Sequence, residues 1–100
     1  MSVTEDSARS ITAPQELGLE TRASFREAAI RELDELAHGG TLNVDLSATT
    51  RVDSAGLSAL MLIQRRAADR GQRVVLQRPS EEFRYMLALT ELSDLFELEK

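Results

Sequence analysis

Three segments of the chain carry apolar residues at the spacing of an amphipathic helix, three or four positions apart. The first starts near Thr21 or Ser24, the latter forming a capping-box pattern with Glu27, and it is followed by Gly39-Gly40. The second starts at Asp53 or Ser54 and stops at Gly71, and the third starts at Ser80. The stripe positions are Phe25, Ala29, Leu33 and Leu36-Ala37 in the first helix, Leu57, Leu60, Met61, Ile63-Gln64 and Ala67 in the second, and Phe83, Met86-Leu87 and Thr90 in the third.

Four shorter segments have the alternation or the β-branched content of strands. They are Leu17 and Leu19 between polar neighbours, Thr41–Ser47, Arg73–Gln77, and Phe96 with Leu98 between glutamates. Strands and helices therefore follow one another in the order β-α-β-α-β-α-β. This order predicts an α/β fold, a small domain with a mostly parallel four-stranded sheet and crossover helices. We expect residues 1–8 to be a flexible tail and residues 9–100 to form the single domain.

Composition excludes several classes of function. The 100 residues carry a net charge of −5, which argues against nucleic-acid binding. The chain has no cysteine and a single histidine, His38, so neither a disulfide nor a Cys/His metal cluster is expected. We interpret His38 as a helix-end residue. No apolar run reaches the roughly 18 residues of a membrane span, and we expect a cytoplasmic protein that does not insert into a membrane.

The most informative stretch joins the second predicted strand to the second predicted helix. It reads Val44-Asp45-Leu46-Ser47, then Arg51-Val52-Asp53-Ser54-Ala55-Gly56-Leu57. At such a junction the first backbone N–H groups of the helix have no partner within it. Ser54 would stand at or beside the cap with its hydroxyl near the surface. Small residues at 55 and 56 would let another molecule approach the helix start. Asp53 and Ser54 are also good capping residues, so capping alone is the alternative interpretation of this stretch.

This stretch resembles the STAS family, the anti-sigma factor antagonists and their relatives, in which a D-L-S-like strand end leads into D-[ST]-x-G-L. The resemblance runs from about Leu17 to Leu98. It implies that a partner anti-sigma factor, itself a serine kinase, phosphorylates Ser54, and that the unphosphorylated form binds this partner and frees the sigma factor. It also implies a phosphatase that resets the switch. The expected partner-binding residues are Asp53, Ser54, Ala55 and Gly56, with Thr49, Thr50, Arg51 and Ser58 added for their proximity.

Two features complete the sequence-based hypothesis. Gln15-Glu16-Leu17-Gly18 stands where many phosphorylated antagonists have a G-E-L-D-like motif, so Gly18 replaces the family acid. The alternative function is the cytoplasmic STAS subunit of an ABC-type lipid transporter, docked on the ATPase subunit, because those subunits share D-[ST]-x-G-L.

We find no nucleophile–base pair and no phosphate-binding glycine loop, so we expect no enzymatic activity and no cofactor. The chain is expected to be a monomer or a weak dimer.

Overall fold

Parallel strand pairing organises the fold, which a computed structural model describes for residues 6–99. One sheet has the strand order β1-β3-β5-β6, and a second, two-stranded sheet pairs β2 with β4. Every strand pair is parallel. The predicted α/β class and parallel four-stranded sheet are therefore confirmed. The elements are β1 (Asp6–Thr12), β2 (Glu16–Leu17), α1 (Arg22–Glu35), β3 (Leu36–Asp45), β4 (Arg51–Val52), α2 (Ser54–Asp69), β5 (Arg73–Gln77), α3 (Glu81–Leu89) and β6 (Glu97–Leu98).

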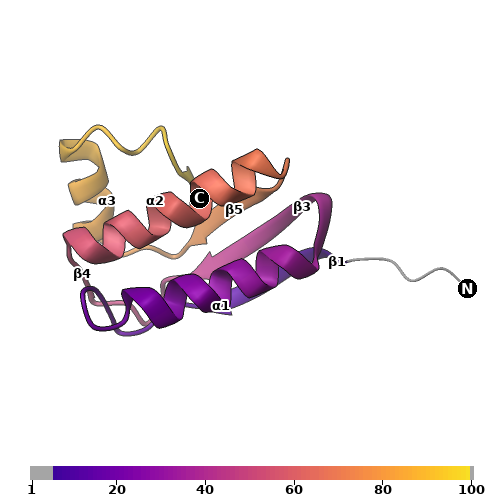
Figure 1. The fold of residues 1–100 in the computed structure, drawn as a ribbon. Coiled ribbons are helices and arrows are strands. Elements are labelled where there is room, and N and C mark those ends of the chain that lie inside the picture. The colour runs from indigo at the N-terminus through magenta and orange to yellow at the C-terminus, as the bar shows by residue number, and fades with distance from the viewer. Residues whose placement is uncertain (1–5, 100) are drawn as a thin grey trace, which may run out of the picture.

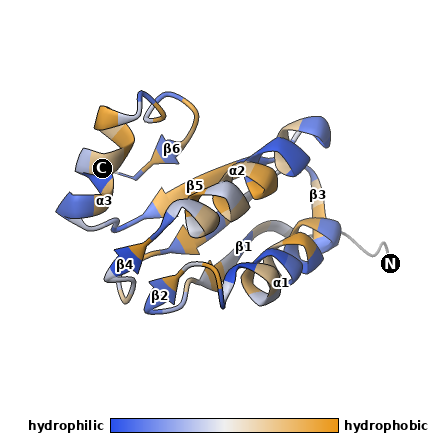
Figure 2. Ribbon diagram, turned by 60° about the vertical axis from the view of Figure 1, so that its left-hand side comes forward, coloured by the Kyte–Doolittle hydropathy of each residue, from blue (hydrophilic) through white to orange (hydrophobic). Residues whose placement is uncertain are grey.

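Helices α1 and α2 lie side by side on one face of the sheet (Figures 1 and 2). The strands β1, β3, β5 and β6 follow one another across the sheet in chain order. Because crossover connections between parallel strands are right-handed, this order places successive helices on the same face of the sheet. The core fills the space between these layers. Its fully buried members include Leu33 from α1, Leu60 and Ile63 from α2, and Leu42 and Leu76 from the sheet.

The first strand of the sheet is β1, and the prediction that Leu17 and Leu19 form this strand is wrong. Residues 6–8, expected in a flexible tail, form the start of β1, while residues 1–5 lie outside the described residues. Leu17 belongs to the separate β2, and the Leu19 side chain is 66% exposed in the following turn. Ile11 is the only large apolar residue of β1, so its sequence shows little alternation.

Helix α1 is shorter than predicted. It ends at Glu35, and Leu36 begins β3 directly. The pairing of β1 with β3 shifts register between Leu36 and Thr41, and Gly39 occupies this irregular stretch with a φ of +83°. His38 therefore lies in β3 and not at a helix end. At the other end of α1 the N-cap position is Thr21, the first of the two predicted residues, so the capping box at Ser24 is wrong.

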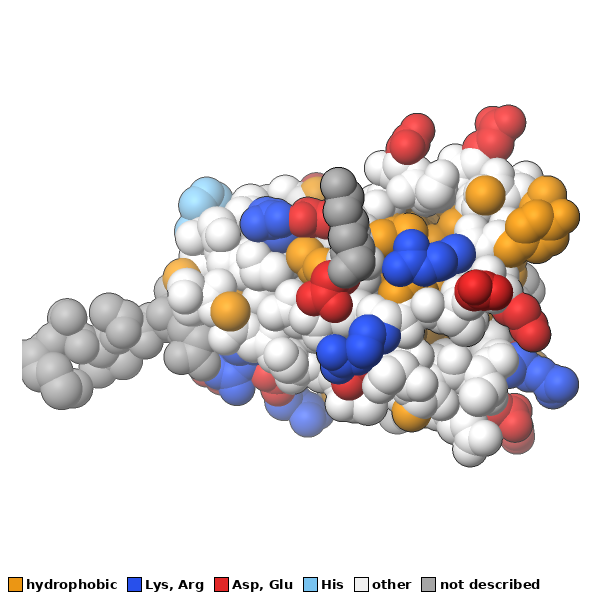
Figure 3. Space-filling model, turned by 180° about the vertical axis from the view of Figure 1, so that it is seen from behind, with side chains coloured by type: hydrophobic (Ala, Val, Ile, Leu, Met, Phe, Trp, Pro, Cys, Tyr) orange, Lys and Arg blue, Asp and Glu red, His pale blue; other side chains and the backbone are white. Residues whose placement is uncertain are grey.

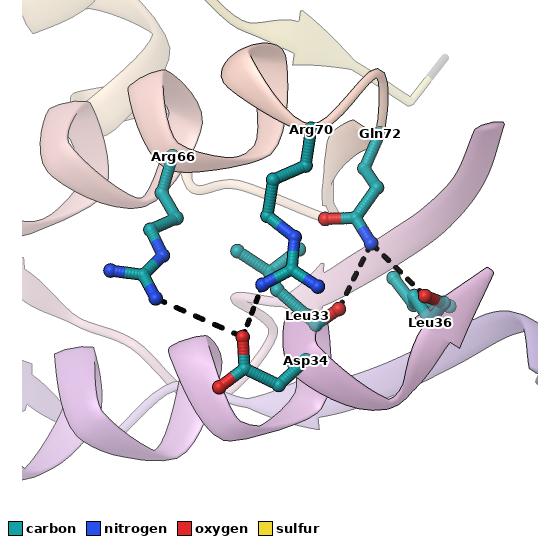
Figure 4. A network of polar contacts seen from close by, with 6 residues as sticks. All are labelled: Leu33, Asp34, Leu36, Arg66, Arg70 and Gln72. Carbon is teal, nitrogen blue, oxygen red and sulfur yellow. Dashed lines mark hydrogen bonds and ion pairs between the residues drawn. The ribbon is translucent and has the colours of Figure 1, made fainter. Parts of the chain in front are cut away.

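Polar contacts fasten the end of α1 to the end of α2 (Figure 4). The buried Gln72 side chain, just after α2, donates to the carbonyl oxygens of Leu33 (2.9 Å) and Leu36 (3.2 Å). At the surface Asp34 pairs with Arg66 and Arg70. The Gln72 amide thus adds hydrogen bonds to carbonyl groups at the end of α1, where the Leu33 oxygen also accepts from the Leu36 N–H.

The opposite face of the sheet carries few apolar residues apart from Val75. Charged side chains of both signs are dispersed over this side, and apolar side chains gather towards α3 (Figure 3). Asp45 and Arg78 form an ion pair at 3.0 Å, and Arg73 pairs with Glu97. None of the described helices is long and apolar enough to cross a membrane.

Candidate functional site

The segment before α2 is hydrogen-bonded along its length to the segment that contains β2. The Thr50 N–H donates to the carbonyl oxygen of Gln15 (2.9 Å), and the Asp53 N–H donates to that of Leu17 (3.2 Å). The Thr49 hydroxyl donates to the carbonyl oxygen of Pro14 at 2.8 Å. This ladder of main-chain contacts fixes the position and direction of the first turn of α2.

Asp53 is the N-cap of α2, as its residue type predicts. One carboxylate oxygen accepts a hydrogen bond from the Gly56 N–H at 2.9 Å, and the other accepts from the Leu19 N–H at 3.2 Å. The Gly56 hydrogen bond is the largest of the effects that hold the pKa of Asp53 below its ordinary value. The carboxylate therefore links the helix start to the turn between β2 and α1.

Ser54 is the first residue of α2, and its side chain is exposed. Its hydroxyl makes no hydrogen bond to any of the residues that the structure describes. Ser58 lies one turn further along the helix and is also exposed. Arg51 and Thr50 precede the cap, and both are exposed. Ser54, Ser58, Thr50 and Arg51 are therefore all accessible, in the first turns of α2 or directly before them.

Two residues predicted to contact a partner face inward instead. Thr49 is 6% exposed, and its hydroxyl is used by Pro14. Gly56 is buried, and a Cβ built on it would lie 2.0 Å from the carbonyl oxygen of Leu17. The prediction that Gly56 admits another molecule is therefore wrong, because the space is filled by β2 of the same chain. Ala55 is half-buried beside it.

Gly18 has a structural role that the sequence analysis missed. A Cβ on Gly18 would lie 2.4 Å from a carboxylate oxygen of Asp53, below the closest approach that real Cβ atoms make. The missing side chain at 18 thus makes room for the capping carboxylate. The sequence signal for this role was the glycine directly after Leu17, which we interpreted only as the loss of a family acid.

Asp45, at the end of β3, organises the turn that leads towards the site. It accepts a hydrogen bond from the Ser47 N–H at 2.9 Å and pairs with Arg78. The Ser47 N–H and then the Arg78 guanidinium lower the pKa of Asp45 to about 2. The D-L-S-like motif therefore forms the turn at the end of β3, with Leu46 buried and Ser47 exposed.

His38, the base that the sequence offers, is not placed to activate Ser54 as a nucleophile. His38 lies near the start of β3, whereas the site follows its end. Among residues 6–99 no group of three or more His, Cys, Asp or Glu side chains is placed to hold a metal ion. What the arrangement offers is an exposed hydroxyl on a firmly held helix start, suited to modification or to docking.

Comparison with known proteins decides the family. A family model described as "Mlab, STAS domain" matches residues 3–98. This chain is a STAS domain. Comparison with curated proteins gave no significant match.

Among solved structures, this STAS domain is similar to TM1081 of Thermotoga maritima, a proposed anti-sigma factor antagonist. The TM-score is 0.81 at 23% identity, over 95% of this chain and 80% of that one. It is also similar to the anti-sigma factor antagonist SpoIIAA in its unphosphorylated form. There the TM-score is 0.71 at 16% identity, over 100% of this chain and 84% of the other. At these identities the likeness shows a shared fold.

Proposed function

We propose that this STAS domain is an anti-sigma factor antagonist that works by partner switching in the cytoplasm. In its unphosphorylated form it binds an anti-sigma factor that is also a serine kinase, and phosphorylation of Ser54 releases this partner. The observation that carries the proposal is the exposed Ser54 hydroxyl on the first turn of α2, next to the capping Asp53. Two relatives of the same fold are described as anti-sigma factor antagonists, one of them in an unphosphorylated form, which supports the proposal.

The switch rests on local electrostatics. A phosphate adds about −1.5 to −2 charges and three acceptor oxygens. A helix N-terminus tolerates such an anion, because the helix dipole stabilises it by about 0.3–1 kcal/mol. A bulky dianion inside a closely packed interface, in contrast, weakens binding by several kcal/mol, which is a hundredfold or more in affinity. Phosphorylation therefore acts on the complex and leaves the domain folded.

Binding to purified anti-sigma kinases from the source genome tests this function. We expect at least one of them to bind the wild-type chain and to transfer phosphate to Ser54. Ser54→Ala should bind and accept no phosphate, whereas Ser54→Asp should lose at least tenfold in affinity. Ser10→Asp is the matched control, because Ser10 is also exposed but lies in β1, away from α2. Phosphate on Ser47, Thr49 or Thr50, or no binding to any kinase, would refute the proposal.

Gly18 favours a second candidate function, docking on the ATPase subunit of an ABC-type lipid transporter. Position 18 carries glycine in place of the family acid, and a Cβ there would meet the Asp53 carboxylate, so residue 18 adds no carboxylate beside the start of α2. Neighbouring permease and ATPase genes, together with tight binding to the purified ATPase subunit that Ser54→Asp abolishes, would establish this function in place of the first.

A further inference from the structure

The surface around Ser54 continues along α2 into an open apolar groove. Ser54, Ser58, Leu62 and Arg65 succeed one another at four, four and three positions, so they share one face of the helix. The groove measures about 540 Å³ and lies between α2 and the segment that joins α3 to β6. In Figure 1 this segment passes beside α2. The lining residues are Ser58, Met61, Leu62, Gln64, Arg65, Ala68 and Leu95.

Large apolar side chains of the groove remain accessible. Met61 is 37% exposed, Leu62 is 46% exposed and Leu95 is 41% exposed. Met61 was predicted to belong to the apolar stripe with Leu60 and Ile63, but its side chain is exposed. Three such side chains that converge from two separate segments form a patch, and a patch of this kind is typical of a protein contact.

The charge of the groove is opposite to that of the whole chain. None of the described lining residues is acidic, although the chain carries a net charge of −5. Arg65 lines it and makes no ion pair or hydrogen bond with any residue in the described range 6–99. Its neighbours Arg66 and Arg70, on the side of α2 that faces α1, both pair with Asp34. Arg65 thus offers an uncompensated positive charge beside an apolar surface.

We propose that this groove binds an acidic amphipathic helix of the same partner that contacts Ser54. This inference rests on the proposed function and extends it to a second contact. Apolar side chains of the partner helix would pack between Leu62, Met61 and Leu95. A carboxylate on its polar edge would pair with Arg65. Such helix-in-groove docking combines a few apolar anchors with a charged edge that sets direction.

The test uses the anti-sigma kinase that binds the wild-type chain, with affinity measured by calorimetry. We expect Leu62→Asp and Arg65→Glu each to weaken binding at least tenfold while Ser54 is still phosphorylated at high kinase concentration. The matched controls are Leu89→Asp on α3, where the leucine is 66% exposed, and Arg31→Glu on the exposed side of α1. Both controls should bind like wild type.

Hydrogen exchange of the complex supplies an independent readout. The proposal expects binding to slow amide exchange in the connection around Leu95 as well as in the first turn of α2. If Ser54→Asp weakens binding but both groove variants bind like wild type, the groove proposal is wrong and the proposed function stands. If Leu62→Asp changes only the oligomeric state in light scattering, the occupant is a second copy of the chain and the proposal is also wrong. If no kinase binds the wild-type chain, both proposals fail.

Discussion

At the scale of single residues, Gly18 and Asp53 act as a pair. The capping carboxylate occupies the space beside Gly18, and the φ of Gly18 is not in the left-handed region, so the requirement for glycine is steric. Gly18→Ala should displace the carboxylate and weaken its bonds to Gly56 and Leu19. We expect a loss of about 1 kcal/mol in the free energy of unfolding, as for the loss of an N-cap.

A double-mutant cycle distinguishes this cause from a general intolerance of alanine at position 18. Asp53→Ser keeps a capping oxygen but shortens the side chain, so Gly18→Ala should be nearly neutral in that background. Urea unfolding of the four proteins gives the coupling energy. An equal loss in both backgrounds would show that the two residues are independent.

Asp45 makes the stability of the fold sensitive to acid. The pKa of its carboxyl is about 2 in the folded chain and 3.8 in its ordinary state. Because the folded pKa is the lower one, the ionised carboxylate stabilises the fold at pH values above 3.8, and this contribution disappears as the pH falls from about 4 to about 2. Asp45→Asn should therefore be less stable than wild type at pH 6, with the difference shrinking over that window.

Thermal unfolding at a series of pH values measures this effect of Asp45. Asp94→Asn is the control for the loss of one negative charge, because Asp94 is exposed in the connection between α3 and β6 and makes no polar contact with the described residues. A gap between wild type and Asp45→Asn that stays constant from pH 6 to pH 2 would contradict the assigned role of the Ser47 and Arg78 contacts.

At the scale of secondary structure, buried and exposed contacts between α1 and α2 differ in how much they contribute to the free energy of unfolding. Gln72→Ala should remove two buried hydrogen bonds, to the carbonyl oxygens of Leu33 and Leu36, while the Leu33 oxygen keeps the Leu36 N–H as a donor. We expect a loss of about 1–3 kcal/mol, as for two hydrogen bonds that each contribute about 0.5–1.5 kcal/mol. Asp34→Ala breaks the exposed pairs with Arg66 and Arg70 and should cost less than about 1 kcal/mol. Chemical denaturation of both variants tests this order, and the reverse order would contradict it.

The elements with strong local patterns could be predicted from the sequence. Helices α2 and α3 start at the predicted caps Asp53 and Ser80, and β5 has the predicted bounds Arg73–Gln77. Each combines a suitable capping or β-branched residue with a clear apolar period, so local preference and burial agree. The four main strands and three helices therefore follow the expected order.

The elements that depend on distant contacts could not be predicted. β1 has one large apolar residue, and it forms a strand because β3 offers it a hydrogen-bonding edge. Leu36 continues the apolar stripe of α1 but is buried as part of β3, so the apolar spacing alone did not indicate where the helix ends. In the site, the exposure of Ser54 agreed with its position at a helix start. The burial of Gly56 depends on the approach of β2, which local spacing does not reveal.

At the scale of the whole molecule, the fold separates stability from the candidate switch. The core lies between the sheet and α1 with α2, whereas Ser54 stands outside it, where the chain passes from the end of β3 into α2. The ends of parallel strands commonly carry binding sites, because the loops there are held by the sheet but remain accessible. Here the pairing of β2 with β4 also holds the segment directly before α2 in place.

This separation predicts that charge at position 54 barely changes the stability of the isolated domain. Ser54→Asp places a carboxylate on the first turn of α2, where the helix dipole favours it by about 0.3–1 kcal/mol and the neighbouring Asp53 opposes it. The two effects offset each other, so the free energy of unfolding should change by less than about 1 kcal/mol, a shift of no more than about 4–8 °C in Tm for a domain of this size. Calorimetry of wild type, Ser54→Asp and the phosphorylated chain measures this shift.

Leu33→Ala is the control, because Leu33 is fully buried and its truncation should cost about 2–5 kcal/mol. A loss from Ser54→Asp as large as that of the control would mean that the hydroxyl supports the fold. Release of a partner would then follow from partial unfolding. If the free energy of unfolding of Ser54→Asp is nearly that of wild type, the free domain is equally well folded in both. A loss of affinity in this variant must then arise from contacts in the complex.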